Sequence, residues 1–125
     1  RVLTAKDVMR RPEPVAQCTA GPRVALHLME EHDISMIFVI TRHRILRGFV
    51  TLEDTVSAVK EGKNLSDILR TDVATVAPDA TIPDILSLIV QSNHPLPVVD
   101  ENGRMHGLVS RASILAALAR KGGEA

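Results

Sequence analysis

The chain has 125 residues with fifteen basic and fifteen acidic side chains, so its formal net charge at pH 7 is zero. A neutral chain lacks the basic surface on which sequence-independent binding of nucleic acid depends. Phe38 and Phe49 are its only aromatic residues, so we expect no nucleic acid polymer among its partners. Apolar residues make up 45% of the sequence, as in ordinary globular proteins, and no apolar run approaches the roughly 18 residues that cross a bilayer.

Cys18 is the only cysteine, which excludes an internal disulfide and favours a reducing compartment. The sequence shows no signal peptide, begins at Arg1 without a methionine and enters helix-like sequence at once. We therefore expect it to be a piece of a longer cytoplasmic polypeptide.

The first half of the chain predicts alternating helices and strands. Thr4 precedes Ala5-Lys6-Asp7, which is a helix-start pattern, and Pro12 ends that helix. Pro22 stands at the front of a second helix with one apolar face. The predicted order is helix, strand, helix, strand, strand and helix, at residues 5–9, 15–18, 22–32, 36–41, 45–50 and 52–60.

The second half repeats this order. Asn64 and Thr81 precede two helices as candidate caps, and the turn at 101–103 separates two strand-like runs. Helices mixed with a hairpin in this way indicate an α+β fold, in which we expect each repeat to be a three-stranded sheet backed by two helices. The predicted elements lie at residues 65–69, 73–77, 82–90, 97–100, 105–109 and 111–120.

The two halves are copies of one unit. The segment 48–54 (GFVTLED) corresponds to 107–113 (GLVSRAS), 59 positions later, and 5–9 (AKDVM) corresponds to 65–69 (LSDIL), 60 positions later. A unit of this length would bury only about 60% of its unfolded surface by itself, so we expect both to share one globule. The predicted repeats are residues 1–61 and 62–125.

Each copy places a glycine, two apolar residues and a Thr or Ser between its last strand and its last helix. In the first copy the Thr51 hydroxyl and the free N–H groups of the helix start can hold an anion such as phosphate. Asp54, one turn later, can accept hydrogen bonds from a pair of sugar hydroxyls. The Thr51-x-x-Asp54 spacing is also a helix-capping motif, as in Thr4-x-x-Asp7; the local pattern favours the cap, and both interpretations stay open at this point.

No other pattern points to catalysis or to a metal. His27, Glu30 and Glu31 share helical spacing, but nothing completes a metal site, so we interpret them as a solvated face. Ser110 and Ser113 have no recognisable base and acid companions for a hydrolytic triad. We therefore predict no catalytic residue and no metal site.

The repeated order of elements resembles a tandem pair of CBS domains, also called a Bateman module, over almost the whole chain. The resemblance is carried by 96–100 (LPVVD), Gly103 and 107–110 (GLVS), with 48–54 in the first copy. It implies two β-α-β-β-α repeats related by a pseudo-twofold axis, and dimerisation of whole modules.

The resemblance also implies a ligand site, because CBS pairs commonly bind adenine nucleotides between their repeats. Thr51 would meet phosphate and Asp54 the ribose, whereas Ser113 replaces the carboxylate in the second copy, where Arg111 could add charge for a phosphate. The ligand would be AMP, ADP, ATP or cyclic di-AMP, and no cofactor would be required. The residues expected at the two sites are Val15, Ala16, Gln17, Phe38, Val39, Thr51, Asp54, Pro97, Val98, Ser110 and Arg111.

A narrower resemblance links 2–9 (VLTAKDVM) and 21–26 (GPRVAL) to the C-terminal CBS pair of ATP-binding subunits in glycine betaine/proline-type ABC importers. It implies a regulatory module without catalysis of its own, attached to a quaternary-amine-transporting ATPase. Through that ATPase the module would reach a membrane permease at the inner face of the cell membrane. The chain contains no G-x-x-x-x-G-K-[ST] phosphate loop, so the ATPase would lie outside it.

Two alternatives to this interpretation remain. The chain could be a structural dimerisation module without a ligand, as Phe38 and Ser113 suggest, because the first can fill the cleft and the second lacks a carboxylate. It could also be the regulatory CBS pair of a different enzyme or of an ion transporter.

Overall fold

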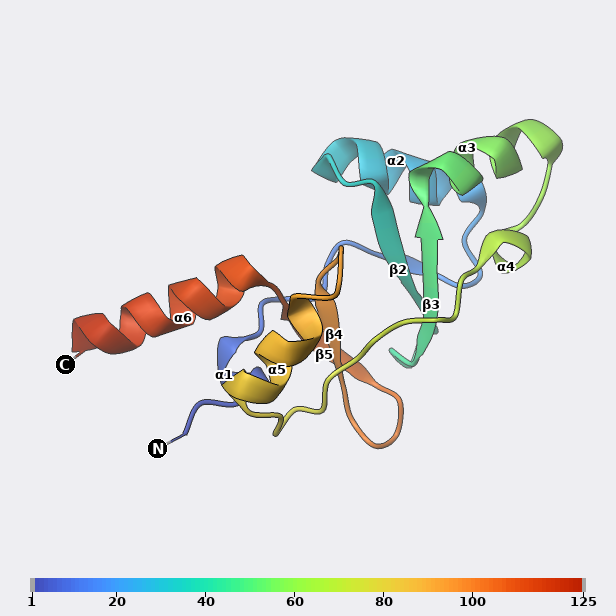
Figure 1. The fold of residues 1–125 in the computed structure, drawn as a ribbon. Helices are drawn as coiled ribbons and strands as arrows, with labels where there is room; N and C mark the ends of the chain where they lie inside the picture. The colour runs from blue at the N-terminus through green and yellow to red at the C-terminus, as the bar shows by residue number, and fades with distance from the viewer. Residues whose placement is uncertain (1, 125) are drawn as a thin grey trace. The chain divides into compact units, whose positions relative to one another are not determined.

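The computed structural model describes residues 2–124, which form six helices and five strands (Figure 1). The chain divides into two compact units. The central unit runs from Glu13 to Val73, and the split unit combines the segment that ends at Pro12 with the segment that begins at Ala74. Helices and two small sheets in this mixed order confirm the predicted α+β class.

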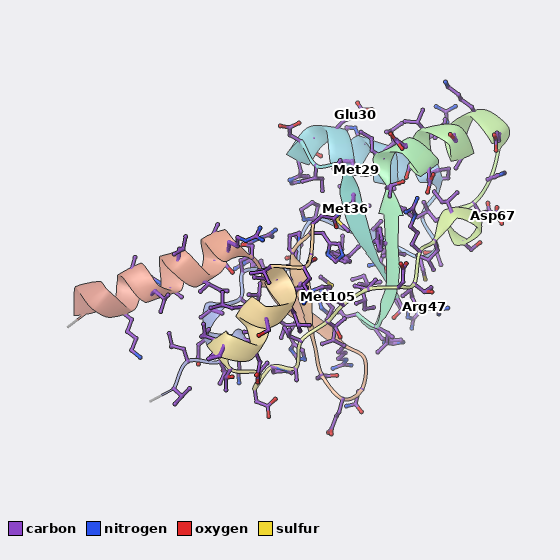
Figure 2. All side chains as sticks on the ribbon, viewed as in Figure 1. Met29, Glu30, Met36, Arg47, Asp67 and Met105 are labelled. Carbon is purple, nitrogen blue, oxygen red and sulfur yellow. The ribbon has the colours of Figure 1, made fainter. Side chains whose placement is uncertain are left out.

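The central unit is a three-stranded sheet with three helices packed beside it. Strand β2 lies in the middle, parallel to β1 and antiparallel to β3. Met29 on α2 is buried in the core of this unit, whereas the next residue, Glu30, lies on the outer side of the helix (Figure 2). The elements are β1 (Val15–Gln17), α2 (Pro22–His32), β2 (Met36–Ile40), β3 (Leu46–Thr51), α3 (Leu52–Glu61) and α4 (Leu65–Ile68).

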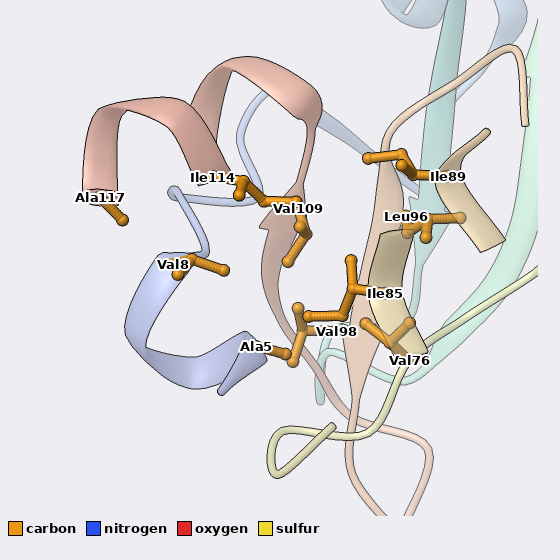
Figure 3. Close-up of a cluster of buried hydrophobic side chains, with 10 residues drawn as sticks. All are labelled: Ala5, Val8, Val76, Ile85, Ile89, Leu96, Val98, Val109, Ile114 and Ala117. Atoms are coloured by element: carbon orange, nitrogen blue, oxygen red, sulfur yellow. The ribbon is translucent and has the colours of Figure 1, made fainter. Parts of the chain in front are cut away.

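The split unit packs three helices around the β4–β5 hairpin. Its core is a cluster of ten buried apolar side chains, most of them Val and Ile (Figure 3). Helix α1 supplies Ala5 and Val8 to this cluster, and α6 supplies Ile114 and Ala117. The elements are α1 (Ala5–Val8), α5 (Ile82–Ile89), β4 (Leu96–Val99), β5 (Met105–Val109) and α6 (Arg111–Glu124).

The strand predicted at 73–77 and the third strand of the second sheet are wrong. The structure forms a single parallel bridge there, in which Val76 exchanges backbone hydrogen bonds with Pro97 and Val99 of β4. The chain turns at Pro78 and Asp79 immediately afterwards, which leaves no room for a longer ladder. Helix α6 also continues beyond residue 120, where it was predicted to end.

Each unit takes a short helix from the other half of the sequence. After α1, Arg10 exchanges two backbone hydrogen bonds with Leu108 of β5, at 2.9 and 3.0 Å. After α4, Arg70 exchanges two with Phe49 of β3, both at 2.9 Å. The compact units and the sequence repeats are therefore different groupings of the chain, and the repeat boundary at residues 61 and 62 stays a prediction.

The close approach of these crossing segments explains why each repeated motif begins with a glycine. A Cβ added at Gly48 would lie 2.1 Å from the carbonyl oxygen of Arg70, and one at Gly107 would lie 2.5 Å from that of Arg10. Both distances are far below van der Waals contact, so a side chain at either position would push the crossing segment away. The glycines thus serve the approach of another part of the same unit.

Candidate ligand-binding site

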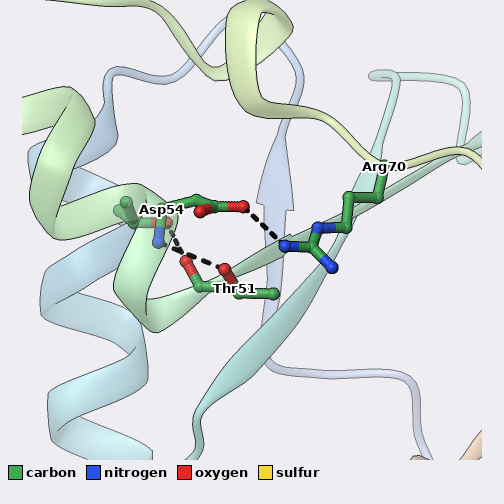
Figure 4. Close-up of polar contacts among 4 residues, drawn as sticks. Thr51, Asp54 and Arg70 are labelled. Carbon is green, nitrogen blue, oxygen red and sulfur yellow. Dashed lines mark hydrogen bonds and ion pairs between the residues drawn. The ribbon is translucent and has the colours of Figure 1, made fainter.

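Thr51 connects β3 to α3 in the central unit (Figure 4). It pairs with Met36 at the end of the sheet and is the N-cap residue of α3, where its Oγ1 accepts a hydrogen bond from the Asp54 N–H at 3.1 Å. The Thr55 hydroxyl donates to the Thr51 carbonyl at 2.6 Å. The Thr51 side chain therefore satisfies one of the free N–H groups that every helix start presents.

The Asp54 carboxylate takes no part in this cap. Its Oδ2 accepts a hydrogen bond from the guanidinium of Arg70 at 3.0 Å, and no other partner of the carboxylate exists among residues 2–124 (Figure 4). The pair lies at the surface, with the side chain of Asp54 38% exposed and that of Arg70 52% exposed. An exposed ion pair of this kind contributes about 0–1 kcal/mol to stability, so it can be separated at little cost.

The other helix starts with the same spacing behave differently. Asp7 accepts a hydrogen bond from the Thr4 N–H at 2.9 Å, and Asp67 accepts one from the Asn64 N–H at 2.8 Å, so both carboxylates close a capping box. The capping interpretation therefore holds for these two acids, whereas at Asp54 the carboxylate is directed toward Arg70.

Sequence analysis did not include Arg70 in the site. Its place could have been found from the repeat, because Arg70 follows 65–69 as Arg10 follows 5–9. What the sequence alone did not reveal is that both segments cross the glycine of the repeated motif, and that in the central unit this crossing brings the Arg70 side chain to the start of α3.

The strand residues predicted to surround the base in the first copy lie together in the central unit. Val15 pairs with Phe38 and Ala16 with Val39 across the β1–β2 ladder. Because side chains alternate along a strand, Phe38 and Val39 face opposite sides of the sheet. Ala16, Phe38 and Val39 are all buried; Ala16 and Val39 belong to the core of the unit, and the Phe38 ring meets that of Phe49 edge to face at 6.4 Å. A base on one side of the sheet can therefore touch one side chain of the Phe38–Val39 pair and not both.

Gln17, the third predicted residue of β1, is exposed and pairs with Ile40 of β2. Val39 also borders a pocket of about 180 Å³ near α4. Cys18, Arg47, Leu65, Ser66 and Leu69 form the rest of its lining.

In the second copy, Ser110 and Ser113 cap the start of α6 through reciprocal hydrogen bonds. The Ser113 Oγ accepts from the Ser110 N–H at 2.9 Å, and the Ser110 Oγ accepts from the Ser113 N–H at 3.0 Å. Arg111 donates to the carbonyl oxygen of Ile89, at the last residue of α5, at 3.2 Å. This arginine therefore fixes the end of one helix against the beginning of another.

A pocket of about 290 Å³ opens beside this junction. Ser110 and Arg111 line it, as does His94, whose Nδ1 lies 2.8 Å from the Pro95 carbonyl oxygen. Pro97 and Val98, which were predicted as the base-side wall, are buried in β4 and do not line this pocket. The rest of the lining is Ile89, Ser92, Asn93, Pro95 and Ala112.

The protein family follows from a comparison of the sequence with family models. The model of the CBS domain matches residues 5–61 and again residues 65–120. The chain belongs to the CBS domain family. The two matches cover both CBS copies, and they confirm the resemblance to a tandem CBS pair.

The curated relatives of this CBS pair include ATP-binding proteins of osmolyte transport. The glycine betaine transport ATP-binding protein OpuAA of Bacillus subtilis is 38% identical over 119 residues, which are 95% of this chain and 28% of the relative. The glycine betaine/carnitine transport ATP-binding protein GbuA of Listeria monocytogenes is 40% identical over 119 residues, 94% of this chain and 30% of the relative. The chain thus spans less than a third of these relatives.

Solved structures share the CBS-pair fold. Staphylococcus aureus OpuCA superposes with a TM-score of 0.75 at 27% identity, covering 91% of this chain and 97% of that one. CbpB in complex with c-di-AMP has a TM-score of 0.78 at 20% identity and covers 99% and 92% of the two chains. CBSX2 in complex with AMP has a TM-score of 0.78 at 23% identity and covers 94% and 96%. At the identities of the last two structures the likeness concerns the fold alone.

Between residues 2 and 124, no helix combines the length and the apolar character required to cross a membrane. In the same range, no three His, Cys, Asp or Glu side chains gather as a metal-binding group would. His27 instead lies 3.6 Å from Glu31 on the exposed face of α2.

Proposed function

We propose that the chain is a regulatory CBS pair that binds an adenine nucleotide and thereby controls the ATPase of a glycine betaine/proline-type ABC importer. The observation that carries the ligand proposal is the Asp54 carboxylate, which is left out of the helix cap and stands beside Thr51 at a partly exposed strand-to-helix junction. A carboxylate in this position can accept both hydroxyls of a ribose, and the Thr51 hydroxyl can turn toward a phosphate. AMP and c-di-AMP in two structures of the same fold support adenine nucleotides as the class to test.

The predicted residues of β1 and β2, with Ser110 and Arg111, keep their proposed roles in this scheme, whereas the buried Pro97 and Val98 do not line the pocket of the split unit. The base would lie against the strands, near Phe38 or Val39 and the backbone of 15–17, and Ser110 and Arg111 would meet a phosphate in the pocket of the split unit. The second copy would not recognise ribose, because Ser113 supplies no carboxylate and both of its serines are engaged with each other.

The regulatory effect would follow from differential affinity. A ligand can shift a two-state module only by the difference in free energy with which it binds the two states. Attached to a transport ATPase, as the names of the relatives suggest, the module would pass this shift to the nucleotide-hydrolysing domain and through it to a permease. We place this assembly at the cytoplasmic face of the membrane and expect the isolated module to hydrolyse nothing.

The test is calorimetric titration of the 125-residue chain with AMP, ADP, ATP and cyclic di-AMP, accompanied by thermal melting. A ligand that binds only the native state raises stability by about 2.7 kcal/mol at one hundred times its Kd. Asp54→Ala should weaken binding at least tenfold. Asp67→Ala, which removes a carboxylate from another helix start of the same unit, should leave affinity within twofold. Equal affinities of both variants would contradict the ribose assignment.

A second candidate is a structural dimerisation module, which one feature of α6 favours. Leu115 and Leu118 are three residues apart on this helix and are 66% and 44% exposed, so they present an apolar stripe. We propose that this stripe contacts a second copy of the chain. Sedimentation velocity should give a dimer for the wild type and a monomer for Leu115→Ser combined with Leu118→Ser. A dimer that no nucleotide stabilises would favour the structural role over the sensing role.

A further inference from the structure

We propose that Arg70 is a second ligand-contacting residue of the central unit and that it makes this site select phosphorylated nucleosides over unphosphorylated ones. This inference rests on the proposed function, because it assigns a further residue to the same site. It starts from three observations: the anchoring of the Arg70 backbone, the Asp54–Arg70 pair, and the absence of such a pair at the matching position of the other repeat.

The backbone of Arg70 is anchored by two hydrogen bonds, whereas its side chain has, in the described part of the chain, a single partner at the surface. Its N–H and its carbonyl are both bonded to Phe49 at 2.9 Å, and its carbonyl lies directly over Gly48. The side chain extends from this fixed point to the start of α3 and is half exposed (Figure 4). The Arg70 side chain can therefore exchange one partner for another without any movement of the main chain.

The Asp54–Arg70 pair occupies the groups that a nucleotide would need. A ribose diol can take the carboxylate only if the guanidinium gives it up, and the released guanidinium can then bind another anion. A nucleotide supplies both partners at once, since its diol can donate to Asp54 while its phosphate receives two parallel hydrogen bonds from Arg70. Neither charge is then left without a partner.

Other ligands do not balance the two charges. Adenosine offers the diol but no anion, so it has to compete with Arg70 for the carboxylate. Inorganic phosphate offers the anion, but it meets the negative charge of Asp54 with nothing to neutralise it. Specificity of this kind comes from the charge that the wrong ligand leaves unpaired, as much as from contacts to the right one.

Arg10, the matching arginine of the split unit, lacks within the described residues the carboxylate partner that Arg70 has. Arg10 crosses β5 as Arg70 crosses β3, yet its guanidinium donates to the carbonyl of the next residue, Arg11, at 3.1 Å. The residue that corresponds to Asp54 is Ser113, which has no charge to offer. The split unit therefore has the arginine without the carboxylate and cannot discriminate in this way.

The experiment compares AMP with adenosine by calorimetry on the wild-type chain and on three variants. Arg70→Gln should lower the affinity for AMP at least tenfold, whereas the affinity for adenosine should stay the same or rise, because its diol no longer competes with the guanidinium for Asp54. Arg70→Lys, which keeps the charge but not the two-pronged geometry, should fall between wild type and Arg70→Gln for AMP. Arg10→Gln is the matched control and should leave both affinities within twofold of wild type.

The outcomes separate this inference from the proposed function. If the wild type binds none of AMP, ADP, ATP and cyclic di-AMP, the proposed function fails, and the inference fails with it. If the wild type binds AMP but Arg70→Gln and Arg70→Lys change the affinities for AMP and adenosine by the same factor, the proposed function stands and the role of Arg70 is overturned. Circular dichroism of each variant checks that it is folded, and Arg70→Lys gives the same comparison with a smaller structural change.

Discussion

The strand-to-helix junctions at Thr51 and at Ser110 occupy corresponding places in their units. Their side chains, however, have different roles. At Ser110 and Ser113 each hydroxyl accepts a hydrogen bond from the backbone N–H of the other residue, so the junction is closed. At Thr51 and Asp54 the threonine caps the helix alone, and the carboxylate is held from outside by Arg70. The same local pattern can thus end in a finished cap or in a group that is ready for a ligand.

The difference shows that the i, i+3 spacing does not decide the role of its second residue. Asp7, Asp67 and Ser113 all return to the backbone of the N-cap residue, whereas Asp54 does not. What distinguishes Asp54 is a partner sixteen residues away that is delivered by the segment after α4. A long-range contact therefore decides which of the two local interpretations applies.

The largest loss of stability is expected when the segment that carries Arg70 can no longer approach β3 closely. Gly48→Ala would place a Cβ 2.1 Å from a backbone oxygen, at a φ of 150° that L side chains rarely adopt. We expect a loss of about 3 kcal/mol in the free energy of unfolding, measured by urea denaturation, from backbone strain and the weakened Phe49–Arg70 hydrogen bonds.

Gly62→Ala is the matched control, because Gly62 also has a positive φ, of 69°, but nothing lies within 4 Å of its added Cβ. It should cost about 1 kcal/mol. Equal losses for the two variants would mean that the crossing segment does not press on β3.

The next variant tests whether the junction of the central unit can be converted to a closed helix cap like that of the split unit. Asp54→Ser should allow a hydroxyl to close the helix start as Ser113 does, and it should lower AMP affinity at least tenfold, which is about 1.4 kcal/mol. Calorimetry provides the affinity, and Ser113→Asp serves as the control that leaves the central unit intact. Unchanged AMP binding by Asp54→Ser would show that the carboxylate is not a ligand group.

A smaller difference separates the capping acids from the one that does not cap. Asp67→Ala removes a hydrogen bond to the Asn64 N–H and should lower the free energy of unfolding by about 1 kcal/mol. Asp54→Ala removes an exposed ion pair and should cost about 0.5 kcal/mol or less. Urea denaturation of both variants measures the difference, and a larger loss for Asp54→Ala would assign it a structural role.

Much of this arrangement could be predicted from the sequence, because local patterns carried it. The apolar periodicity and the proline of 22–32 give α2 as predicted, and 105–109 gives β5, since both depend on neighbouring residues. The strand predicted at 73–77 was wrong because a β-strand needs a partner along its whole length. The turn at Pro78 ends the pairing with β4 after a single bridge. Arg70 escaped notice because its role depends on a crossing that no local pattern encodes.

The two hairpins provide the smallest and most selective comparison. In the first, the Thr41 hydroxyl accepts the backbone N–H groups of His43 and Ile45. In the second, the corresponding side chain is the carboxylate of Asp100, which accepts those of Asn102 and Arg104 and lies 2.8 Å from the Nε2 of His106. The hydrogen bond from His106, followed by that from the Arg104 N–H, lowers the pKa of Asp100 below its ordinary value of 3.8.

A carboxyl group with a lowered pKa in the folded state stabilises the protein above its unfolded pKa, and this contribution is lost as the pH falls through the folded pKa. His106→Ala should therefore raise the pKa of Asp100 toward 3.8 without reaching it, because the two backbone donors remain. A carbon-13 NMR titration of the Asp100 carboxyl below pH 5 measures the change. Arg47→Ala, at the position of the first hairpin that corresponds to His106, should leave this titration unchanged, because Thr41 carries no titratable group there. An identical Asp100 pKa in wild type and His106→Ala would assign the lowered pKa to the hairpin backbone alone.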